Sequence, residues 1–264
     1  MRRLFQLIFL VALAMPTAIS AQEQAGSIFD EGQEHFYSAE YEKAAERFTR
    51  YIQMEPDDPR GYWRKAYALY FEWKRDQHRM FPKLNESERK DFYQLVATGI
   101  AQADAQIAAK KDVDFALYVK ACLLSMRGGV EAGMGPLSLL TARDILKQTL
   151  QVASKSNYQD AKYLEGLTNY NGSFHSFWFR VAGLPHDRDL GLKKIFEAYA
   201  GNNNRFADDV AFVLVNIETD PRNAKRFTQE DVRKISCPLL AKYPRNQLLK
   251  KCCATLCATY QGNL

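Results

Sequence analysis

The four histidines are the side chains most suited to catalysis or metal binding, but they are scattered along the chain, at His35, His78, His175 and His186. An active site of a common type would need a nucleophile beside a base, paired carboxylates, a phosphate-binding loop or a metal cluster. The sequence has no Gly-x-Ser-x-Gly, no phosphate-loop motif, no His-Glu-x-x-His and no dinucleotide-binding fingerprint. We therefore expect no catalytic residues, no cofactor and no metal.

An aromatic segment spans residues 170–185 and concentrates four rings in six residues, at Phe174, Phe177, Trp178 and Phe179. Aromatic side chains anchor both small ligands and protein interfaces. One interpretation is a ligand pocket lined by Tyr170, His175 and Trp178. The other, which we favour, is that the segment folds back as hydrophobic filling between helices.

Five cysteines occur in the chain, at Cys122, Cys237, Cys252, Cys253 and Cys257. Because the number is odd, at least one thiol stays reduced or pairs with another chain. Cys237 falls on the predicted helix before the one that carries Cys252 and Cys253. A disulfide from Cys237 to either of these would join the last two helices.

Residues 1–21 have the three-part pattern of a secretory signal peptide. Arg2 and Arg3 precede an apolar run, and small residues lead to an expected cleavage site after Ala21. A membrane anchor is the alternative, but the run is shorter than the roughly 20 residues that span a bilayer. We expect residues 22–264 to be periplasmic or secreted, without stable membrane insertion.

The composition is that of an ordinary globular protein, with 47% hydrophobic and 25% charged residues. Without residues 1–21 the chain has 34 basic and 31 acidic residues, a formal net charge of +3. This excess is too small to indicate nucleic-acid binding, which needs a concentrated basic surface.

After residue 26 the apolar residues recur at helical spacing, and Gly-, Asn- and Pro-containing turns separate the helices. The run Val210 to Ile217 is β-branched enough for a buried strand, but no partner strand is predicted, so we expect a buried helix. The predicted antiparallel pairs are 27–38 with 41–54, 60–76 with 87–110, 114–127 with 137–154, 158–171 with 187–200, and 204–219 with 228–242, followed by a last helix at 245–259.

The first pair resembles the tetratricopeptide repeat family, whose unit is about 34 residues long. The matching positions lie within residues 25–70: Gly32, Tyr41, Ala44, Phe48 and Pro56 in one repeat, and Tyr62 and Ala66 in the next. In this pattern the small Gly32 lets two helices approach, and Phe48 fills the space between them. Beyond residue 75 the match weakens. There Gly166-x-x-x-Tyr170, followed by an aromatic segment and a Gly-Leu helix, is similar to degenerate repeats of bacterial envelope proteins of this family.

The resemblance implies an all-α, right-handed superhelical solenoid of antiparallel helix pairs, with degenerate repeats in its C-terminal half. The first helix of each pair would line a concave groove for a peptide or a partner protein. By the same resemblance, the residues that face the groove are Phe29, Gln33, Phe36, Arg60, Trp63, Arg64, Tyr67 and Tyr70.

Arg60 and Arg64 stand one helical turn apart, so both could bind a carboxylate of a partner. Alternatively, both arginines are solvated and Trp63 packs on the next repeat. Our first hypothesis is a non-catalytic interaction scaffold that binds a protein or peptide in the cell envelope. The alternative is a small-molecule-binding accessory of a solute uptake system.

Overall fold

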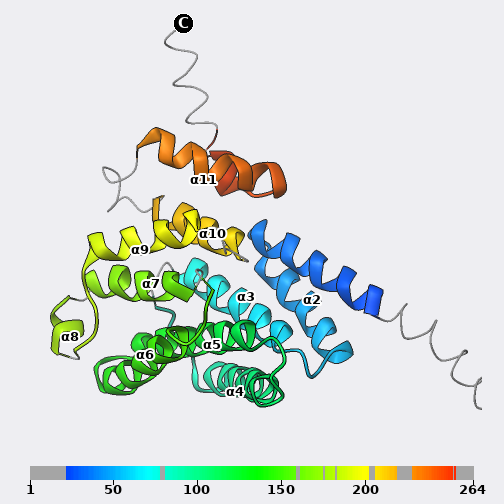
Figure 1. Cartoon of the computed structure of the whole chain (residues 1–264), viewed down its shortest axis with the longest axis horizontal. Coiled ribbons are helices and arrows are strands. Elements are labelled where there is room, and N and C mark those ends of the chain that lie inside the picture. The colour runs from blue at the N-terminus through cyan, green and yellow to red at the C-terminus, as the bar shows by residue number, and fades with distance from the viewer. Residues whose placement is uncertain are drawn as a thin grey trace, which may run out of the picture.

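The computed structural model describes residues 22–77, 81–158, 161–174, 176–181, 183–201, 206–218, 228–251 and 253 (Figure 1). Within these ranges all regular secondary structure is helical, and no strand is present. None of the helices described is both long and apolar enough to cross a bilayer. The expected signal peptide, residues 1–21, lies outside the described residues.

The helices follow one another with short connections, as the periodicity predicts. Residues 22–37 form the first helix and residues 247–251 belong to the last. Those between are α2 (Tyr41–Met54), α3 (Pro59–Gln77), α4 (Glu86–Ala108), α5 (Val113–Gly133), η1 (Pro136–Ser138), α6 (Leu139–Ala153), α7 (Ala161–Ser173), α8 (Ser176–Val181), α9 (Arg188–Ala200), α10 (Ala207–Glu218) and α11 (Gln229–Lys242).

The sequence predicted the helix at residues 210–217 but not the short helix α8. The run Val210 to Ile217 lies within α10, so the prediction of a helix there is confirmed. The short helix α8, in contrast, was not predicted and lies inside the aromatic segment.

Side-chain caps set several helix starts. Asn85 accepts a hydrogen bond from the backbone N–H of Glu88, and the Glu88 carboxylate accepts one from the backbone N–H of Asn85, both at 2.9 Å. Thr228 and Asp231 form the same reciprocal arrangement before α11. These caps satisfy N–H groups that the first helical turn leaves without partners, so local sequence fixes these boundaries.

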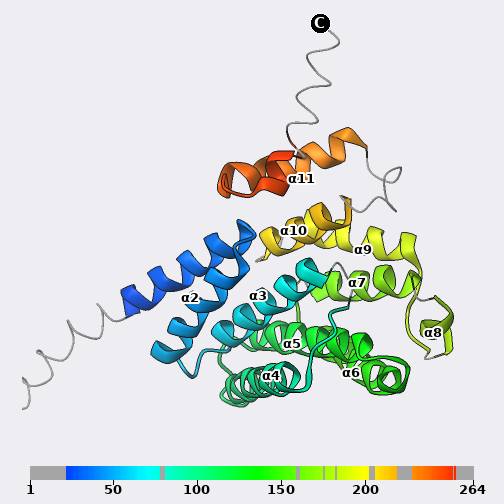
Figure 2. The ribbon, with the colours of Figure 1, turned by 180° about the vertical axis from the view of Figure 1, so that it is seen from behind.

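Neighbouring helices pack against each other in the order of the chain, and the principal contacts include α2 with α3, α5 with α6, α7 with α9, and α10 with α11. Both views place α4, α5 and α6 on one side of the molecule and α10 and α11 on the other, with α3 and α7 between them (Figures 1 and 2). The predicted pairing of helices is therefore confirmed.

Glycines allow close helix approach at two crossings. A Cβ added at Gly32 would lie 2.7 Å from a ring carbon of Phe48, so the first helix and α2 meet as the repeat pattern predicts. At the crossing of α7 and α9, a Cβ at Gly191 would lie 2.6 Å from the backbone nitrogen of Tyr170 and 2.8 Å from the carbonyl oxygen of Gly166. Two helix backbones are in contact here, and no side chain can move aside.

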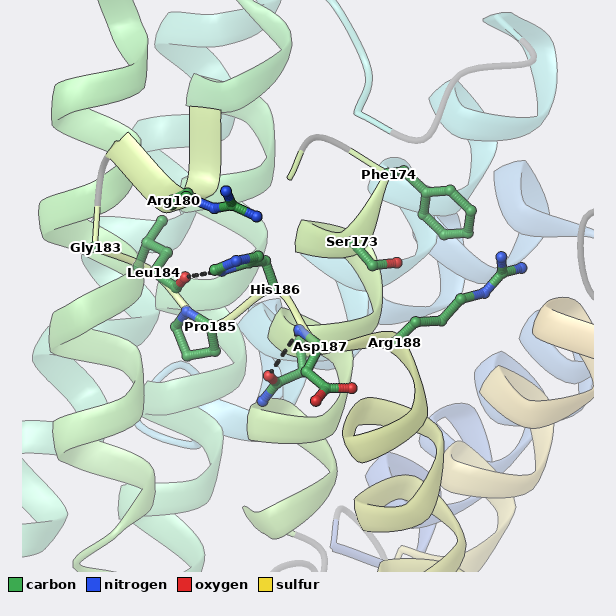
Figure 3. A pocket seen from close by; sticks show the side chains of 10 residues that line it. Ser173, Phe174, Arg180, Gly183, Leu184, Pro185, His186, Asp187 and Arg188 are labelled. Atoms are coloured by element: carbon green, nitrogen blue, oxygen red, sulfur yellow. Dashed lines mark hydrogen bonds between the residues drawn. The ribbon is translucent and has the colours of Figure 1, made fainter. Parts of the chain in front are cut away.

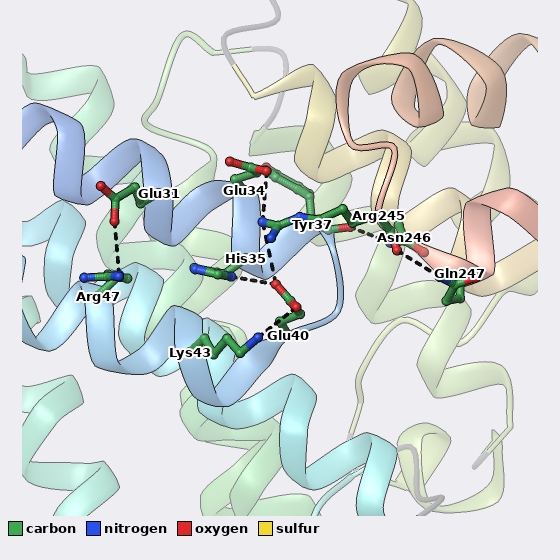
Figure 4. A network of polar contacts seen from close by, with 10 residues as sticks. All are labelled: Glu31, Glu34, His35, Tyr37, Glu40, Lys43, Arg47, Arg245, Asn246 and Gln247. Carbon is green, nitrogen blue, oxygen red and sulfur yellow. Dashed lines mark hydrogen bonds and ion pairs between the residues drawn. The ribbon is translucent and has the colours of Figure 1, made fainter.

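The segment after α11 packs against the first helix. The ring of Tyr243 stacks on that of Tyr37 with centroids 4.4 Å apart, and the Asn246 side chain donates to the Tyr37 carbonyl. Arg245 bridges Glu34 at 2.9 Å and Glu40 at 3.6 Å (Figure 4). The helices do not continue as an open stack, because the C-terminal segment covers the end of the first helix.

The α7–α9 crossing gives a stability prediction. Gly191→Ala should destabilise the fold by about 1–3 kcal/mol, because the new methyl group meets rigid backbone. Gly26→Ala is the matched control: an added Cβ there meets nothing within 4 Å, and alanine favours the first helix. Urea unfolding of both variants measures the difference. Equal stability of the two variants would contradict the backbone contact.

Candidate functional site

The inner face formed by the first helix, α3 and α5 is covered by α10. The ring of Phe212 lies 5.4 Å from that of Phe36 and 5.6 Å from that of Phe71. Phe206, just before α10, stacks on Tyr118 at 4.4 Å. The face that was expected to form an open groove therefore holds a helix of the same chain.

A buried ion pair joins α10 to α3. The Arg64 guanidinium donates to both carboxylate oxygens of Asp209, at 2.6 and 3.0 Å, and the Tyr37 hydroxyl donates to the same carboxylate at 2.7 Å. The side chains of Arg64 and Asp209 are 3% and 0% exposed. Arg64 also lies over the Trp63 ring, 4.1 Å from its centroid. Both charges are thus paired inside the protein, and the buried Arg64 Nε is left without a hydrogen-bond partner among the described residues.

The surroundings hold these groups in fixed protonation states. Burial by itself would lower the pKa of the Arg64 guanidinium, but the adjacent Asp209 carboxylate outweighs it and holds that pKa well above its ordinary value. Burial raises the pKa of the Tyr37 hydroxyl, and Asp209 adds to this effect. Arg64 therefore stays charged and Tyr37 stays protonated, as a structural ion pair requires.

Four of the eight predicted groove residues do not lie on an open face. The side chains of Phe36, Trp63, Arg64 and Tyr67 are buried, although Trp63 and Arg64 contribute to the wall of a hollow and Tyr67 to the wall of a cavity described below. The physical reason is the sequence of α10: its residues from Val210 to Val215 are almost fully buried, so that helix needs cover on every side.

The alternative interpretation of the two arginines is also only partly correct. Arg64 is not solvated, whereas the Arg60 side chain is 42% exposed and pairs with Asp58 at 2.6 Å. Trp63 does pack on the next helix pair, edge-on to Tyr118 at 5.5 Å.

Three of the predicted groove residues remain partly exposed beside α10. Phe29, Gln33 and Arg60 line an open hollow of about 610 Å³. The Gln33 Oε1 atom is buried and has no hydrogen-bond partner among the described residues. This hollow is the part of the expected groove that α10 leaves accessible.

A second cavity, of about 540 Å³, lies between α10 and the helices α3, α5 and α7. Tyr70, the last of the predicted groove residues, lines it together with Tyr67 and Phe71 of the same helix. The opposite wall comes from α5 and α7, and Val213 and Ile217 of α10 close it. Its polar side chains include Ser125, Thr168, Asn171 and Asn216, and its charged ones are Lys74 and Arg75.

The predicted pocket residues are only partly placed by the structure. Tyr170 is buried and lines this cavity. His175 and the side chain of Trp178 lie outside the described residues. Phe179 packs with Leu146 and Leu184, which supports the interpretation of the aromatic segment as filling. Phe177, at 66% exposed, does not take part in that filling.

A shallower, polar hollow of about 940 Å³ lies where α7, α8 and α9 meet (Figure 3). Its polar groups already make structural contacts. The Nδ1 atom of His186 lies 3.0 Å from the Leu184 carbonyl, and Asp187 caps α9 by accepting from the Leu190 N–H. No acid–base pair forms among them, and no group of residues suited to hold a metal ion occurs in the described part of the chain.

Of the predicted disulfide partners, Cys237 and Cys253 lie together. Their Sγ atoms are 3.1 Å apart, a hydrogen-bond distance and not that of a covalent S–S bond. Cys252, the other predicted partner of Cys237, lies outside the described residues. Proximity thus favours Cys253 of the two alternatives.

Comparison with known proteins adds no assignment: no family model, no curated protein and no solved structure matches this chain. The candidate site therefore has to be argued from its own geometry.

Sequence reasoning missed Lys74 and Arg75 and the part that α10 plays in the cavity. A signal for Lys74 was present. It occupies position i+7 after Tyr67, with Tyr70 and Phe71 at i+3 and i+4, and these positions share one face of a helix. No signal in the sequence shows that Val213 and Ile217 lie against that face.

The buried ion pair predicts unequal effects of removing carboxylates. Asp209→Asn should destabilise the protein by about 3–5 kcal/mol, because the Arg64 charge is left buried without its partner. Glu230→Gln removes the partner of Arg233 on the surface of α11, where water screens the ion pair, so its loss should be much smaller. Chemical denaturation of both variants measures this. A loss for Asp209→Asn no larger than for Glu230→Gln would disprove the structural role of the pair.

The thiol contact predicts a specific cross-link. Mild oxidation should form a disulfide between Cys237 and Cys253, and non-reducing mass spectrometry should detect the linked peptides. Cys253→Ser should abolish the link, whereas Cys252→Ser should retain it. The reverse pattern would show that Cys252 is the partner of Cys237.

Proposed function

We propose that this chain is a non-catalytic binding protein of the tetratricopeptide type, exported to the periplasm or secreted, that holds a small apolar molecule in the cavity beside α10. This proposal develops the small-molecule alternative of the sequence analysis, which was an accessory of a solute uptake system. Of the pocket residues predicted there, Tyr170 lines this cavity. The observation that carries the proposal is the cavity of about 540 Å³ lined by aromatic side chains.

Two features of the cavity support this proposal. Its volume lies within the range of roughly 300–1,000 Å³ that is typical of small-molecule sites. Its walls also combine large apolar side chains with a few polar ones, which is the usual composition of a site that takes up most of a ligand's surface.

The position of α10 argues for a small molecule over an extended peptide. A peptide in a groove of this family would contact the inner faces of successive first helices. Here α10 contacts Phe36 and Arg64 in that place, and Phe206, just before α10, contacts Trp63. Displacing α10 would expose an apolar helix and leave Asp209 without Arg64, which costs several kcal/mol.

A second candidate is the scaffold function that the resemblance implies, restricted to the open hollow. Phe29 offers an aromatic surface there, and Arg60 a partly exposed charge. The Gln33 Oε1 acceptor could take a backbone N–H of a protein partner in the cell envelope.

The small-molecule proposal can be tested with a substitution that fills the cavity with a large side chain. Ser125→Trp places a large side chain in the cavity, and Ser87→Trp makes the same change at an exposed position of α4. The purified protein should bind the neutral probe N-phenyl-1-naphthylamine saturably. Ser125→Trp should weaken this binding at least about tenfold, since it removes the space that the probe needs, and Ser87→Trp should leave it unchanged.

Circular dichroism and thermal unfolding show whether both variants fold. Absence of saturable binding, or binding that Ser125→Trp does not alter, would contradict the small-molecule proposal. A partner protein recovered equally by the wild type and Ser125→Trp would then favour the scaffold function.

A further inference from the structure

The charged side chains described in the cavity lining are both positive. Among the described residues that line the cavity, Lys74 and Arg75 at the end of α3 are the charged ones, and none of the described lining residues carries a carboxylate or an imidazole. Two cations in the described part of a lining are complementary to an anion.

These two cations lie at the edge of an aromatic wall. The Lys74 ammonium is 5.3 Å from the centroid of the Phe71 ring and 5.8 Å from that of Tyr70. The rings belong to the cavity lining, so the ammonium lies directly beside the apolar space.

Arg75 marks where the cavity meets water. Its side chain is 50% exposed, and its guanidinium lies 5.3 Å from the centroid of the Tyr41 ring, which also lines the cavity. Its Nε atom donates to the exposed Asp76 carboxylate, and its Nη1 atom donates to the Ala39 carbonyl at 3.3 Å. The contact with Ala39 joins α3 to the turn before α2 and positions the guanidinium at the rim.

Away from these cations the lining is mainly apolar, and its polar side chains there are uncharged. The side chains that continue the wall into α5, α6 and α7 include Met126, Leu146, Leu164 and Leu167. The site therefore has a charged rim and a mainly apolar interior. An amphiphile is complementary to both, because it combines a polar head group with an apolar chain.

We propose that the ligand of this cavity is an anionic amphiphile, whose apolar chain lies among the aromatic side chains and whose head group pairs with Lys74 and Arg75. This inference rests on the proposed function and specifies its ligand class. A cationic amphiphile would be repelled at the rim, and a neutral one would gain nothing from the two charges. Carboxylate and phosphate head groups share the required chemistry.

The experiment compares ligands that have the same alkyl chain and different head groups. Dodecanoate, dodecyl phosphate and dodecan-1-ol compete with N-phenyl-1-naphthylamine for the wild type, for the double variant Lys74→Gln/Arg75→Gln and for the control Lys110→Gln/Lys111→Gln. The control removes the same charge at two exposed positions that do not line the cavity.

For the double variant we expect the affinity for the better of the two anions to fall about tenfold, equivalent to about 1.4 kcal/mol. The affinity for dodecan-1-ol should stay within about twofold, and the control should behave as the wild type. Added salt should weaken anion binding and leave alcohol binding unchanged, because mobile ions screen a half-exposed ion pair. The better anion identifies the head group.

Failure of this inference is distinguishable from failure of the proposed function. If the probe and the alcohol bind but the double variant does not weaken either anion, the cavity binds apolar molecules and the head-group assignment is wrong. The same conclusion follows if the control variant reproduces the loss. If no probe binds at all, the proposed function itself is wrong. Unfolding curves for each variant confirm that a loss of affinity is not a loss of fold.

Discussion

The buried contact between Arg64 and Asp209 is the constraint on which the arrangement of this protein depends. A carboxylate on an apolar helix can be buried only where a cation and further donors satisfy it. Arg64 and the Tyr37 hydroxyl supply these in one place, on α3 and the first helix. Because Asp209 shifted by one turn would lose all of these partners, the pair fixes α10 at one height along the inner wall.

The position of α10 determines where the open hollow and the apolar cavity described above lie. Phe206 and Phe212 cover the middle of the wall through ring contacts with Tyr118 and Phe36. What remains is an open hollow on one side, near Arg60, and the apolar cavity on the other, near Tyr70. A helix that completes the hydrophobic core thereby also gives the cavity its shape.

The contact between the segment after α11 and the first helix reinforces this arrangement. The stacking of Tyr243 on Tyr37 lies directly beside the ion pair, and the Tyr243 hydroxyl donates to Asp208 at 2.8 Å. The same two aromatic residues thus connect α10, the turn after α11 and the first helix. Burial in this cluster keeps its hydroxyl groups protonated, since the pKa of Tyr37 and that of Tyr243 are both raised by desolvation. The groups around Asp209 remain donors across the physiological pH range.

The sequence by itself determined the helical class, the position of nearly every helix and the approach of Phe48 to Gly32, because periodicity, caps and glycine spacing are local signals. It also offered a pocket at Tyr170 as the less favoured interpretation of the aromatic segment, and it predicted that Cys237 lies near the last helix. It could not place α10 in the groove, since an apolar helix must be buried but its sequence does not say against what. Arg64 and Asp209 are 145 residues apart in the chain. Only the tertiary structure brings them together, and with them it decides which inner residues are core and which, such as Lys74 and Tyr70, face an open cavity.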